Sequence, residues 1–279
     1  DEDNIVPNIT DYNTILTLAF MSSNAYYETP KNNKDWYNLS SPWNNNGNFD
    51  LNKSTDGVRG QIFVDNYNET MVIAIKGSEA GSTSTNDKLN DNLLFSCCCA
   101  RISYLWTTVC DCYKSSYNCN EKCLELELYR NDRYYKQTLR FFLDIIKMYP
   151  GIENIFVTGH SLGGSLSSLL GRTFGLPVVT FEAVPELLAT KRLHLPMPPG
   201  LLKDYENIYH FGNNADPIYL GTCNGVSSSC SIAGYGFETQ CFSGKTCVYD
   251  VVRDKGWTVN ILKHSIKFMI EQVIGGYQQ

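Results

Sequence analysis

Hydrophobic and polar residues alternate along this chain in blocks that predict buried strands and amphipathic helices in turn. Runs of β-branched, aromatic and other apolar residues predict strands at residues 57–65, 70–76, 154–158, 177–182 and 208–211. The first two strands flank a polar turn and form a hairpin. Apolar residues at helical spacing predict helices at residues 11–26, 132–149, 165–172 and 265–270. Helices that alternate with apolar strands predict an α/β fold, with a mainly parallel sheet covered by helices on both faces.

Three stretches fall outside this pattern. Residues 28–54 are rich in Asn, Ser, Pro and Trp, so we expect an irregular exposed loop. Residues 79–95 are small and polar before they turn apolar, which is typical of a mobile lid. The cysteine-rich stretch 97–123 carries four apolar residues at helical spacing: Ile102, Leu105, Trp106 and Val109. We expect this apolar face to pack into the core, and entry into a lipid surface is the alternative.

Length and charge limit the function classes. At 279 residues and 43% hydrophobic content, the chain is long enough for one large α/β domain or two small ones. We expect residues 1–56, a helix and a glycosylated irregular segment, to pack on a core domain at residues 57–279 with a cysteine-rich insertion at 96–124. The net charge of −6 argues against nucleic acid as a partner and against simple electrostatic docking on anionic membranes. No apolar run approaches the roughly 20 residues needed to span a bilayer.

Eleven cysteines and four N-x-S/T sequons indicate an oxidising, luminal compartment. Seven cysteines lie between Cys97 and Cys123, and the other four are Cys223, Cys230, Cys241 and Cys247. The sequons are at Asn8, Asn38, Asn52 and Asn68. A zinc site is the alternative, but the cysteine spacings do not fit the paired C-x₂-C pattern of zinc ligands, so we expect disulfides. The odd count leaves at least one cysteine unpaired or joined to another chain.

The most informative motif is Gly159-His160-Ser161-Leu162-Gly163-Gly164, between the predicted strand at 154–158 and the helix at 165–172. A strand, G-x-S-x-G and a helix form the nucleophile elbow of α/β-hydrolases, a turn so tight that larger side chains at 159 and 163 would collide with neighbouring backbone. The turn exposes Ser161 Oγ at a helix N-terminus, where backbone N–H groups stabilise a developing oxyanion. Ser161 is therefore the expected nucleophile, and a helix-capping serine is the alternative.

A serine nucleophile needs a histidine base, and the chain contains four histidines. His160 lies inside the elbow and is expected to point the wrong way. His194 lies in a proline-rich loop, and His210 lies within a strand, where a buried histidine is common. His264 remains. It comes late in the chain, as this fold requires of the base, at the start of the last predicted helix.

The base needs an orienting carboxylate, which in α/β-hydrolases precedes the histidine in the chain. Asp216 follows the strand at 208–211 immediately, at the sheet edge where this architecture holds its acid. Asp204 precedes the same strand and so lies at the wrong end. Asp250 and Asp254 are weaker rivals. A turn-forming aspartate before proline is the alternative role for Asp216.

A second oxyanion donor is expected where the strand at 70–76 ends, at Gly77-Ser78. A glycine and a hydroxyl residue at the carboxyl end of a central strand suit this role. We therefore expect Ser78 to belong to the oxyanion hole, although a simple strand-ending turn fits the local sequence equally well.

With these residues placed, the chain resembles the class 3 lipase family, the fungal triacylglycerol-lipase branch of the α/β-hydrolases. The matching stretches are Ile73–Ser78, Val157–Gly164, Asn213–Pro217 and His264–Ser265, which cover the core from about residue 57 to 270. The resemblance implies that Ser161 is the nucleophile, Asp216 the acid and His264 the base. It also implies that the backbone N–H groups of Ser78 and Leu162 form the oxyanion hole, without a metal or an organic cofactor. Lys76 departs from the family pattern, which usually has arginine there.

The cysteine run, the Asn-rich first part and the luminal signs resemble, more narrowly, the fungal vacuolar lipases that disintegrate autophagic bodies. This likeness implies a phospholipid-directed lipase in the vacuolar lumen, with a membrane surface as its substrate and a transmembrane helix upstream of Asp1. Triacylglycerol is a further expected substrate, and we expect a monomer. The first residue starts no signal-peptide pattern, so we expect a mature or excised ectodomain. A non-catalytic lipase-like module that binds membranes or proteins and an esterase on non-lipid substrates are the alternatives.

Overall fold

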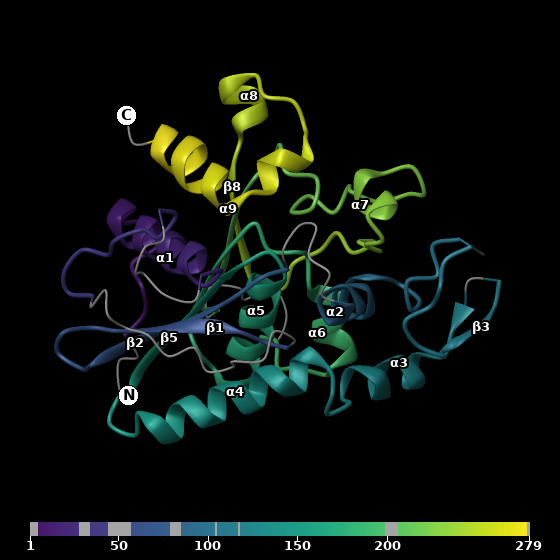
Figure 1. The fold of residues 1–279 in the computed structure, drawn as a ribbon, viewed down its shortest axis with the longest axis horizontal. Helices are drawn as coiled ribbons and strands as arrows, with labels where there is room; N and C mark the ends of the chain where they lie inside the picture. Colours follow the sequence, from purple (N-terminus) through teal and green to yellow (C-terminus); the bar gives the residue numbers. More distant parts are fainter. Residues whose placement is uncertain are drawn as a thin grey trace.

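The computed structural model describes residues 5–27, 34–43, 57–78, 85–103, 105–116, 118–198 and 206–277. Its centre is a six-stranded sheet in the order β1-β2-β5-β6-β7-β8 (Figure 1). The strands are β1 (Gly60–Val64), β2 (Thr70–Ile75), β5 (Asn154–His160), β6 (Val178–Phe181), β7 (Ile208–Asn213) and β8 (Lys245–Tyr249). Only β1 runs antiparallel to its neighbour, and the other five strands are parallel. The carboxyl ends of those five strands therefore meet at one edge, where α/β sheets hold their ligands.

Helices connect and cover the strands. The helices beside the sheet are α1 (Tyr12–Asn24), α2 (Thr85–Phe95), α4 (Tyr134–Met148), α5 (Leu162–Phe174) and α6 (Leu187–Arg192). The shorter or peripheral ones are α3 (Glu121–Leu128), α7 (Ser229–Ile232), α8 (Val251–Lys255), a 3-10 turn at Ile261–His264 and α9 (Ile266–Phe268), which continues as a π-helix over Met269–Ile274. A small hairpin pairs β3 (Tyr113–Ser115) with β4 (Asn118–Cys119). No helix among the described residues is both long and apolar enough to traverse a bilayer.

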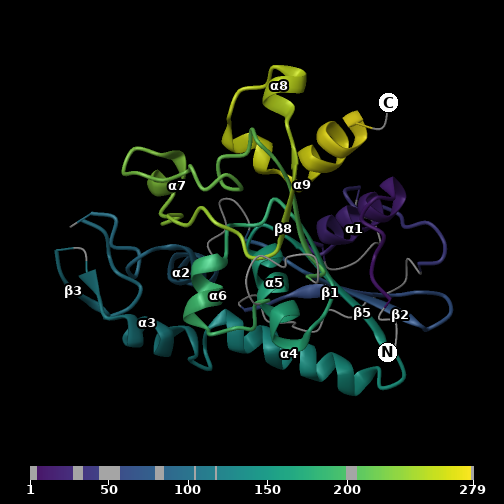
Figure 2. The ribbon, with the colours of Figure 1, turned by 180° about the vertical axis from the view of Figure 1, so that it is seen from behind.

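Alternate residues of β2 face the two halves of the core. Val72 and Ala74 pack with α1 and the chain that follows α9, whereas Met71, Ile73 and Ile75 pack with α4 and α5. The two opposite views show α1 and α9 on one side of the sheet and α4 and α5 on the other (Figures 1 and 2). The predicted α/β-hydrolase class, with a mainly parallel sheet between helices, is confirmed.

The elbow glycines are required by close packing of α5 against β2. A Cβ atom at Gly163 would overlap the carbonyl oxygen of Ile75, and one at Gly159 would lie 2.6 Å from the Gly163 backbone. Since real Cβ atoms do not approach backbone this closely, only glycine lets the strand turn directly into the helix. This contact sets the position of the turn between β5 and α5.

The predicted strands and principal helices are all present, with ends that differ by a few residues. The sequence pattern did not predict the helices α2, α3, α6, α7 and α8, the β3–β4 hairpin or the edge strand β8. In β8, half-buried residues alternate with exposed Thr246 and Val248, so the strand lacks the continuous apolar run that marks the central strands. The loop expected at 28–54 is described only at residues 34–43, which contain neither helix nor strand beyond one bridge at Trp43. Residues 79–84 of the expected lid lie outside the described residues.

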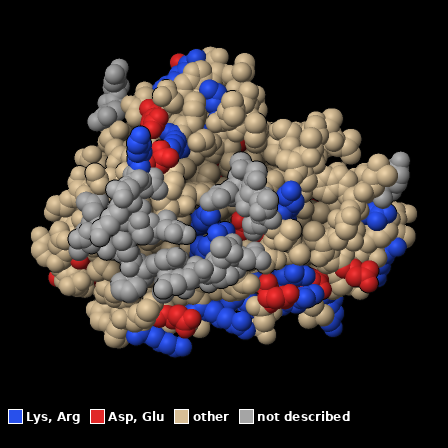
Figure 3. Space-filling view, viewed as in Figure 1, with Lys and Arg blue, Asp and Glu red and all other residues tan. Residues whose placement is uncertain are grey.

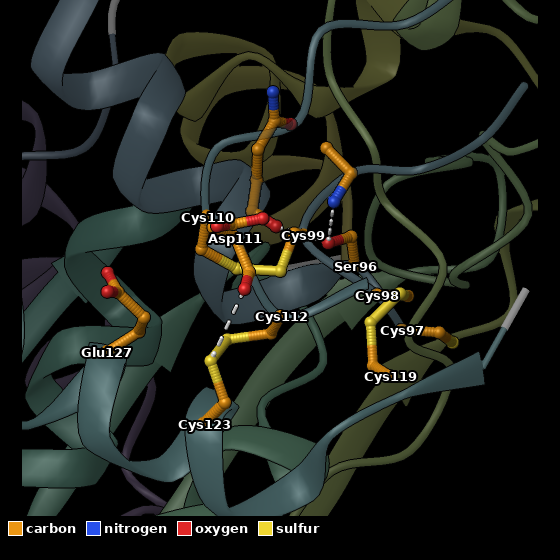
Figure 4. The surroundings of a disulfide bond; sticks show 12 residues. Ser96, Cys97, Cys98, Cys99, Cys110, Asp111, Cys112, Cys119, Cys123 and Glu127 are labelled. Atoms are coloured by element: carbon orange, nitrogen blue, oxygen red, sulfur yellow. Dashed lines mark hydrogen bonds between the residues drawn. A yellow bond between two sulfur atoms is a disulfide. The ribbon is translucent and has the colours of Figure 1, made fainter. Parts of the chain in front are cut away.

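The cysteine-rich stretch is held by disulfides, as predicted (Figure 4). The four disulfides among the described residues are Cys98–Cys119, Cys99–Cys110, Cys112–Cys123 and Cys223–Cys230. Cys97, Cys241 and Cys247 carry free thiols. The Sγ atoms of Cys99, Cys110 and Cys112 lie within 4.8 Å of one another, but each is bonded in a disulfide and offers no thiolate to a metal.

The prediction of an apolar face at helical spacing inside this stretch is wrong. The described residues between Cys99 and Cys110 form bends and turns, and no helix aligns the four apolar side chains. Val109 packs against the core, but Leu105 is 78% exposed. The disulfide between Cys99 and Cys110 closes this segment into a short loop, which overrides the helical spacing of its apolar residues.

Candidate active site

Ser161 occupies a strained turn at the carboxyl end of β5. Its backbone has φ 56° and ψ −128°, in the left-handed half of conformational space that serine rarely adopts. The turn is held by a hydrogen bond from the Ser161 N–H to the Phe181 carbonyl of β6, at 3.3 Å. This conformation sets the Ser161 hydroxyl at the sheet edge, immediately before the first turn of α5.

The structure brings Ser161, His264 and Asp216 together from three distant parts of the chain. His264 Nε2 lies 2.9 Å from Ser161 Oγ, and His264 Nδ1 lies 2.7 Å from Asp216 Oδ2. Asp216 follows β7, and His264 ends the 3-10 turn before α9. In this arrangement one imidazole nitrogen can accept the serine proton while the other donates to the carboxylate.

Asp216 is fully buried and well supplied with donors. Its Oδ1 accepts a hydrogen bond from the Ile218 N–H at 2.8 Å, and its Oδ2 accepts one from His264. Burial alone would raise the pKa of Asp216, but the neighbouring His264 and the hydrogen bonds from His264, Glu182 and Ile218 outweigh burial and lower that pKa. Asp216 is therefore a carboxylate suited to stabilise a positive imidazolium.

The two weaker candidates for the acid are engaged elsewhere. Asp250 caps α8 by accepting from the Arg253 N–H, and it also accepts from the Asn214 side chain. Asp254 accepts hydrogen bonds from Arg253 and Tyr277. Asp204, which was expected at the wrong end of β7, lies outside the described residues.

His160 contributes to the site in a way that its sequence position did not reveal. Its Nε2 lies 2.7 Å from the His264 carbonyl oxygen and must donate to it, so Nδ1 accepts from the Tyr26 hydroxyl, also at 2.7 Å. Burial, and next the charge of His264, lowers the pKa of His160 to about 3. With both ring nitrogens engaged, His160 is a neutral support for the His264 backbone.

The other two histidines have different partners. His210 is fully buried within β7, between the Thr180 hydroxyl and the Ser243 carbonyl oxygen. His194 is exposed and contacts Glu125 on α3. These partners lie apart from Ser161, His264 and Asp216, in agreement with the expected positions of the two histidines in a strand and a loop.

Ser78 lies next to the nucleophile, anchored to α2. Its hydroxyl donates to Asp91 Oδ2 at 2.6 Å, and the preceding Gly77 is so close to the elbow that a Cβ atom there would lie 3.2 Å from Ser161 Cβ. Burial raises the pKa of Asp91 well above its usual value. Leu162 follows Ser161 and begins α5, so its N–H belongs to the helix N-terminus. The two predicted donors therefore flank Ser161.

A cavity of about 710 Å³ opens beside these residues. Ser78, His160, Ser161 and His264 line its polar part. Its other walls are mostly apolar and include Ile218, Tyr235, Phe237, Ile261 and Ile266. A volume of this size fits a small ligand, and apolar walls beside a nucleophile suit a hydrocarbon chain attached to a reactive carbonyl.

Sequence reasoning missed a second buried acid at the site, Glu182. This residue follows β6 directly, is fully buried, and accepts hydrogen bonds from the backbone N–H and side-chain amide of Asn213. The signal was available, because Glu182 ends a predicted strand at the same sheet edge as Asp216.

The predicted glycosylation sites are surface residues where the structure describes them. Asn8, Asn38 and Asn68 are exposed, and Asn52 lies outside the described residues. Exposure leaves these three amide groups accessible to a glycosylating enzyme.

Comparison with known proteins gives the same family as the motifs. Residues 72–175 match the model of the family described as "Lipase (class 3)". The whole chain is 56% identical to "Putative lipase ATG15" of Saccharomyces cerevisiae, and 98% of the chain is 59% identical to the protein of that name in Candida glabrata. The chain spans about 55% of the length of each relative.

Solved structures of lower identity also match. The Lip2 lipase of Yarrowia lipolytica is 19% identical with a TM-score of 0.43, over 88% of this chain and 81% of that one. A lipase of Rhizopus microsporus var. chinensis is 14% identical with a TM-score of 0.40, over 77% of this chain and 70% of that one.

The anchor between Ser78 and Asp91 generates a test that needs no knowledge of the substrate. An alkyl phosphonate ester should label Ser161, and Ser78→Ala should slow this labelling about tenfold, because the donor loop loses its attachment to α2. Ser78→Thr keeps the hydroxyl and should react like the parent, as should the surface control Ser115→Ala. Labelling rates followed by intact-protein mass spectrometry check this, and an unchanged rate in Ser78→Ala would contradict it.

Proposed function

Because this chain belongs to the class 3 lipase family, we propose that it is a serine hydrolase that cleaves acyl ester bonds of membrane phospholipids, and of triacylglycerol as a second substrate. The observation that carries the proposal is the hydrogen-bonded series Ser161, His264, Asp216 at the wall of a mostly apolar cavity. A module that only binds membranes or proteins has no physical need for this series.

In the proposed mechanism, Ser161 Oγ attacks the acyl carbonyl while His264 Nε2 accepts its proton. Asp216 accepts the hydrogen bond from His264 Nδ1 and stabilises the imidazolium. The oxyanion is held by the N–H groups of Ser78 and Leu162. His264 then protonates the departing alcohol, and a water molecule releases the fatty acid by the same route. No step calls for a metal or an organic cofactor.

The surface around the cavity favours a lipid over a polar substrate. Ile232 on α7 is 77% exposed, and Leu262 in the 3-10 turn is 74% exposed. Leu262 lines the cavity, and Ile232 lies between the lining residues Cys230 and Ala233. We call these two exposed side chains the apolar rim of the cavity. The surface over α7 is drawn almost wholly as uncharged residues (Figure 3). An apolar rim can enter a lipid surface and admit an acyl chain from it.

We place this activity in the lumen of the secretory or endosomal pathway, and specifically in the vacuole. The four disulfides indicate an oxidising compartment, and the name of the relatives suggests an autophagic role. The proposed role is lysis of autophagic bodies and other vesicles, by a monomer anchored through a helix upstream of residue 1.

Isolated autophagic bodies should lyse when the parent protein is added and stay intact when the Ser161→Ala variant is added.

Fatty-acid release tests the proposed chemistry. The parent should release fatty acid from phosphatidylcholine vesicles and hydrolyse a soluble short-chain ester, and Ser161→Ala should lower both rates at least about a thousandfold. Release is measured by mass spectrometry and the soluble ester by absorbance. Hydrolysis of the soluble ester alone would favour the esterase alternative. No Ser161-dependent hydrolysis of either substrate would favour the binding module.

A substitution in the apolar rim tests lipid binding separately from the chemical step. Ile232→Asp should reduce vesicle hydrolysis about tenfold, since a charge replaces a side chain that enters the lipid, while the soluble ester is cleaved at the parent rate. The matched control is Leu126→Asp on α3, which is 63% exposed and lies away from the cavity. Equal effects of the two variants on vesicle hydrolysis would show that the rim has no special role.

A further inference from the structure

Glu182 and Asp216 form a buried pair of carboxyl groups behind His264. Both side chains are completely excluded from solvent, and the Glu182 carboxyl hydrogen-bonds Asp216. Two ionised carboxylates in contact without water repel each other strongly, so a buried pair of this kind holds one proton. The position of that proton decides how much negative charge faces His264.

The rest of the hydrogen bonding ties Glu182 to the base as well as to the acid. Asn213 donates to the Glu182 carboxyl from its backbone N–H at 3.2 Å and from its side-chain amide. The same amide also donates to the Lys263 carbonyl oxygen at 3.2 Å, one residue before His264. Asn213 therefore fixes Glu182 relative to both Asp216 and the turn that carries His264.

The backbone at Glu182 indicates that its side chain is needed. Glu182 has φ 46°, a left-handed conformation that glycine adopts without strain and that glutamate rarely adopts. A glutamate at this position carries both backbone strain and a buried carboxyl group. Residues under such combined constraints cluster at functional sites.

The environment places the shared proton on Glu182. Burial, and next the charge of Asp216, raises the pKa of Glu182 well above its usual value, although the bonds from Asn213 oppose this. Asp216 has the opposite tendency because His264 lies beside it. A neutral Glu182 can then donate its O–H to an ionised Asp216.

The other titratable groups around the pair keep fixed charges. Burial raises the pKa of Tyr219 above its usual range, so Tyr219 remains a neutral phenol that donates to the His210 carbonyl oxygen. His160 is neutral, with its pKa lowered to about 3 by burial and by His264. Among the described groups that face the pair, His264 is thus the one whose charge changes in the proposed reaction.

We propose that Glu182 is a positioning residue that donates a hydrogen bond from its neutral carboxyl group to Asp216 and thereby extends the series to Ser161, His264, Asp216 and Glu182. This proposal rests on the proposed serine hydrolase function. The donated hydrogen bond withdraws charge from Asp216, so the carboxylate holds the imidazolium form of His264 less tightly. His264 is therefore neutral, and able to act as a base, at a lower pH than it would be beside an unassisted aspartate, which suits an acidic lumen.

Three variants of Glu182 separate the hydrogen bond from the space that the side chain fills. Glu182→Gln keeps a neutral donor for Asp216 and an acceptor for Asn213. Glu182→Leu keeps the volume without a donor. Glu182→Gly removes the side chain and relieves the left-handed backbone, so it tests the same loss if the leucine variant does not fold. Glu186→Gln is the matched control, because Glu186 is also fully buried but bonds Ser168 and Ser243 instead of Asp216.

The pH at which the His264 imidazole takes up a proton, followed by NMR of the folded protein, tests the proposal without an activity assay. In Glu182→Leu and Glu182→Gly this midpoint should rise by about one pH unit. The pH below which kcat/KM for a soluble ester declines should rise by the same amount. Glu182→Gln and Glu186→Gln should both keep the parent midpoint.

The outcomes distinguish this proposal from the proposed function. If Glu182→Leu and Glu182→Gly keep the His264 midpoint of the parent but lose activity at every pH, Glu182 has only a structural role. A His264 midpoint that shifts as far in Glu182→Gln as in Glu182→Leu would also overturn the proposal. The expected NMR shifts in a chain that hydrolyses no ester would support the hydrogen bond from Glu182 and contradict the hydrolase function.

Discussion

The close contact between α5 and the end of β2 is the constraint on which the site depends. Gly163 lies so near the Ile75 carbonyl that the helix begins directly at the sheet edge, and the chain reaches it only through the strained backbone of Ser161. Because the neighbouring strands are parallel, the same edge also collects Ser78 after β2, Glu182 after β6 and Asp216 after β7. His264 completes the set from the 3-10 turn Ile261–His264, which comes after β8 and α8 in the chain.

Charge at this edge is kept to a minimum by sharing protons. Asp216 is the buried carboxylate that faces the base, and it is surrounded by donors from Ile218, His264 and Glu182. His160 stays neutral while it supports the His264 carbonyl. A single compensated negative charge can stabilise an imidazolium that forms briefly during turnover.

The sequence predicted the parts of the site that follow from short-range rules. Glycine spacing identified the elbow, and chain order together with the ends of apolar strands selected Asp216 and His264. The position of Glu182 at the end of a predicted strand was visible in the sequence. Its role and that of His160 were not, because they depend on contacts with Asn213, Tyr26 and the His264 backbone, which no local pattern encodes. The segment around Leu105 was misjudged for a related reason, since disulfide pairing overrode its helical spacing. The edge strand β8 lacks the apolar run that made its neighbours visible.

A crystal structure of the protein after reaction with a long-chain alkyl phosphonate tests the central claim most directly. The account predicts phosphorus bonded to Ser161 Oγ, with the phosphoryl oxygen within about 3 Å of the Ser78 and Leu162 backbone nitrogens. The alkyl chain should lie along Ile218, Phe237 and Ile266. A phosphonate on another residue, or one whose oxygen faces away from both nitrogens while its alkyl chain extends into solvent, would contradict the account.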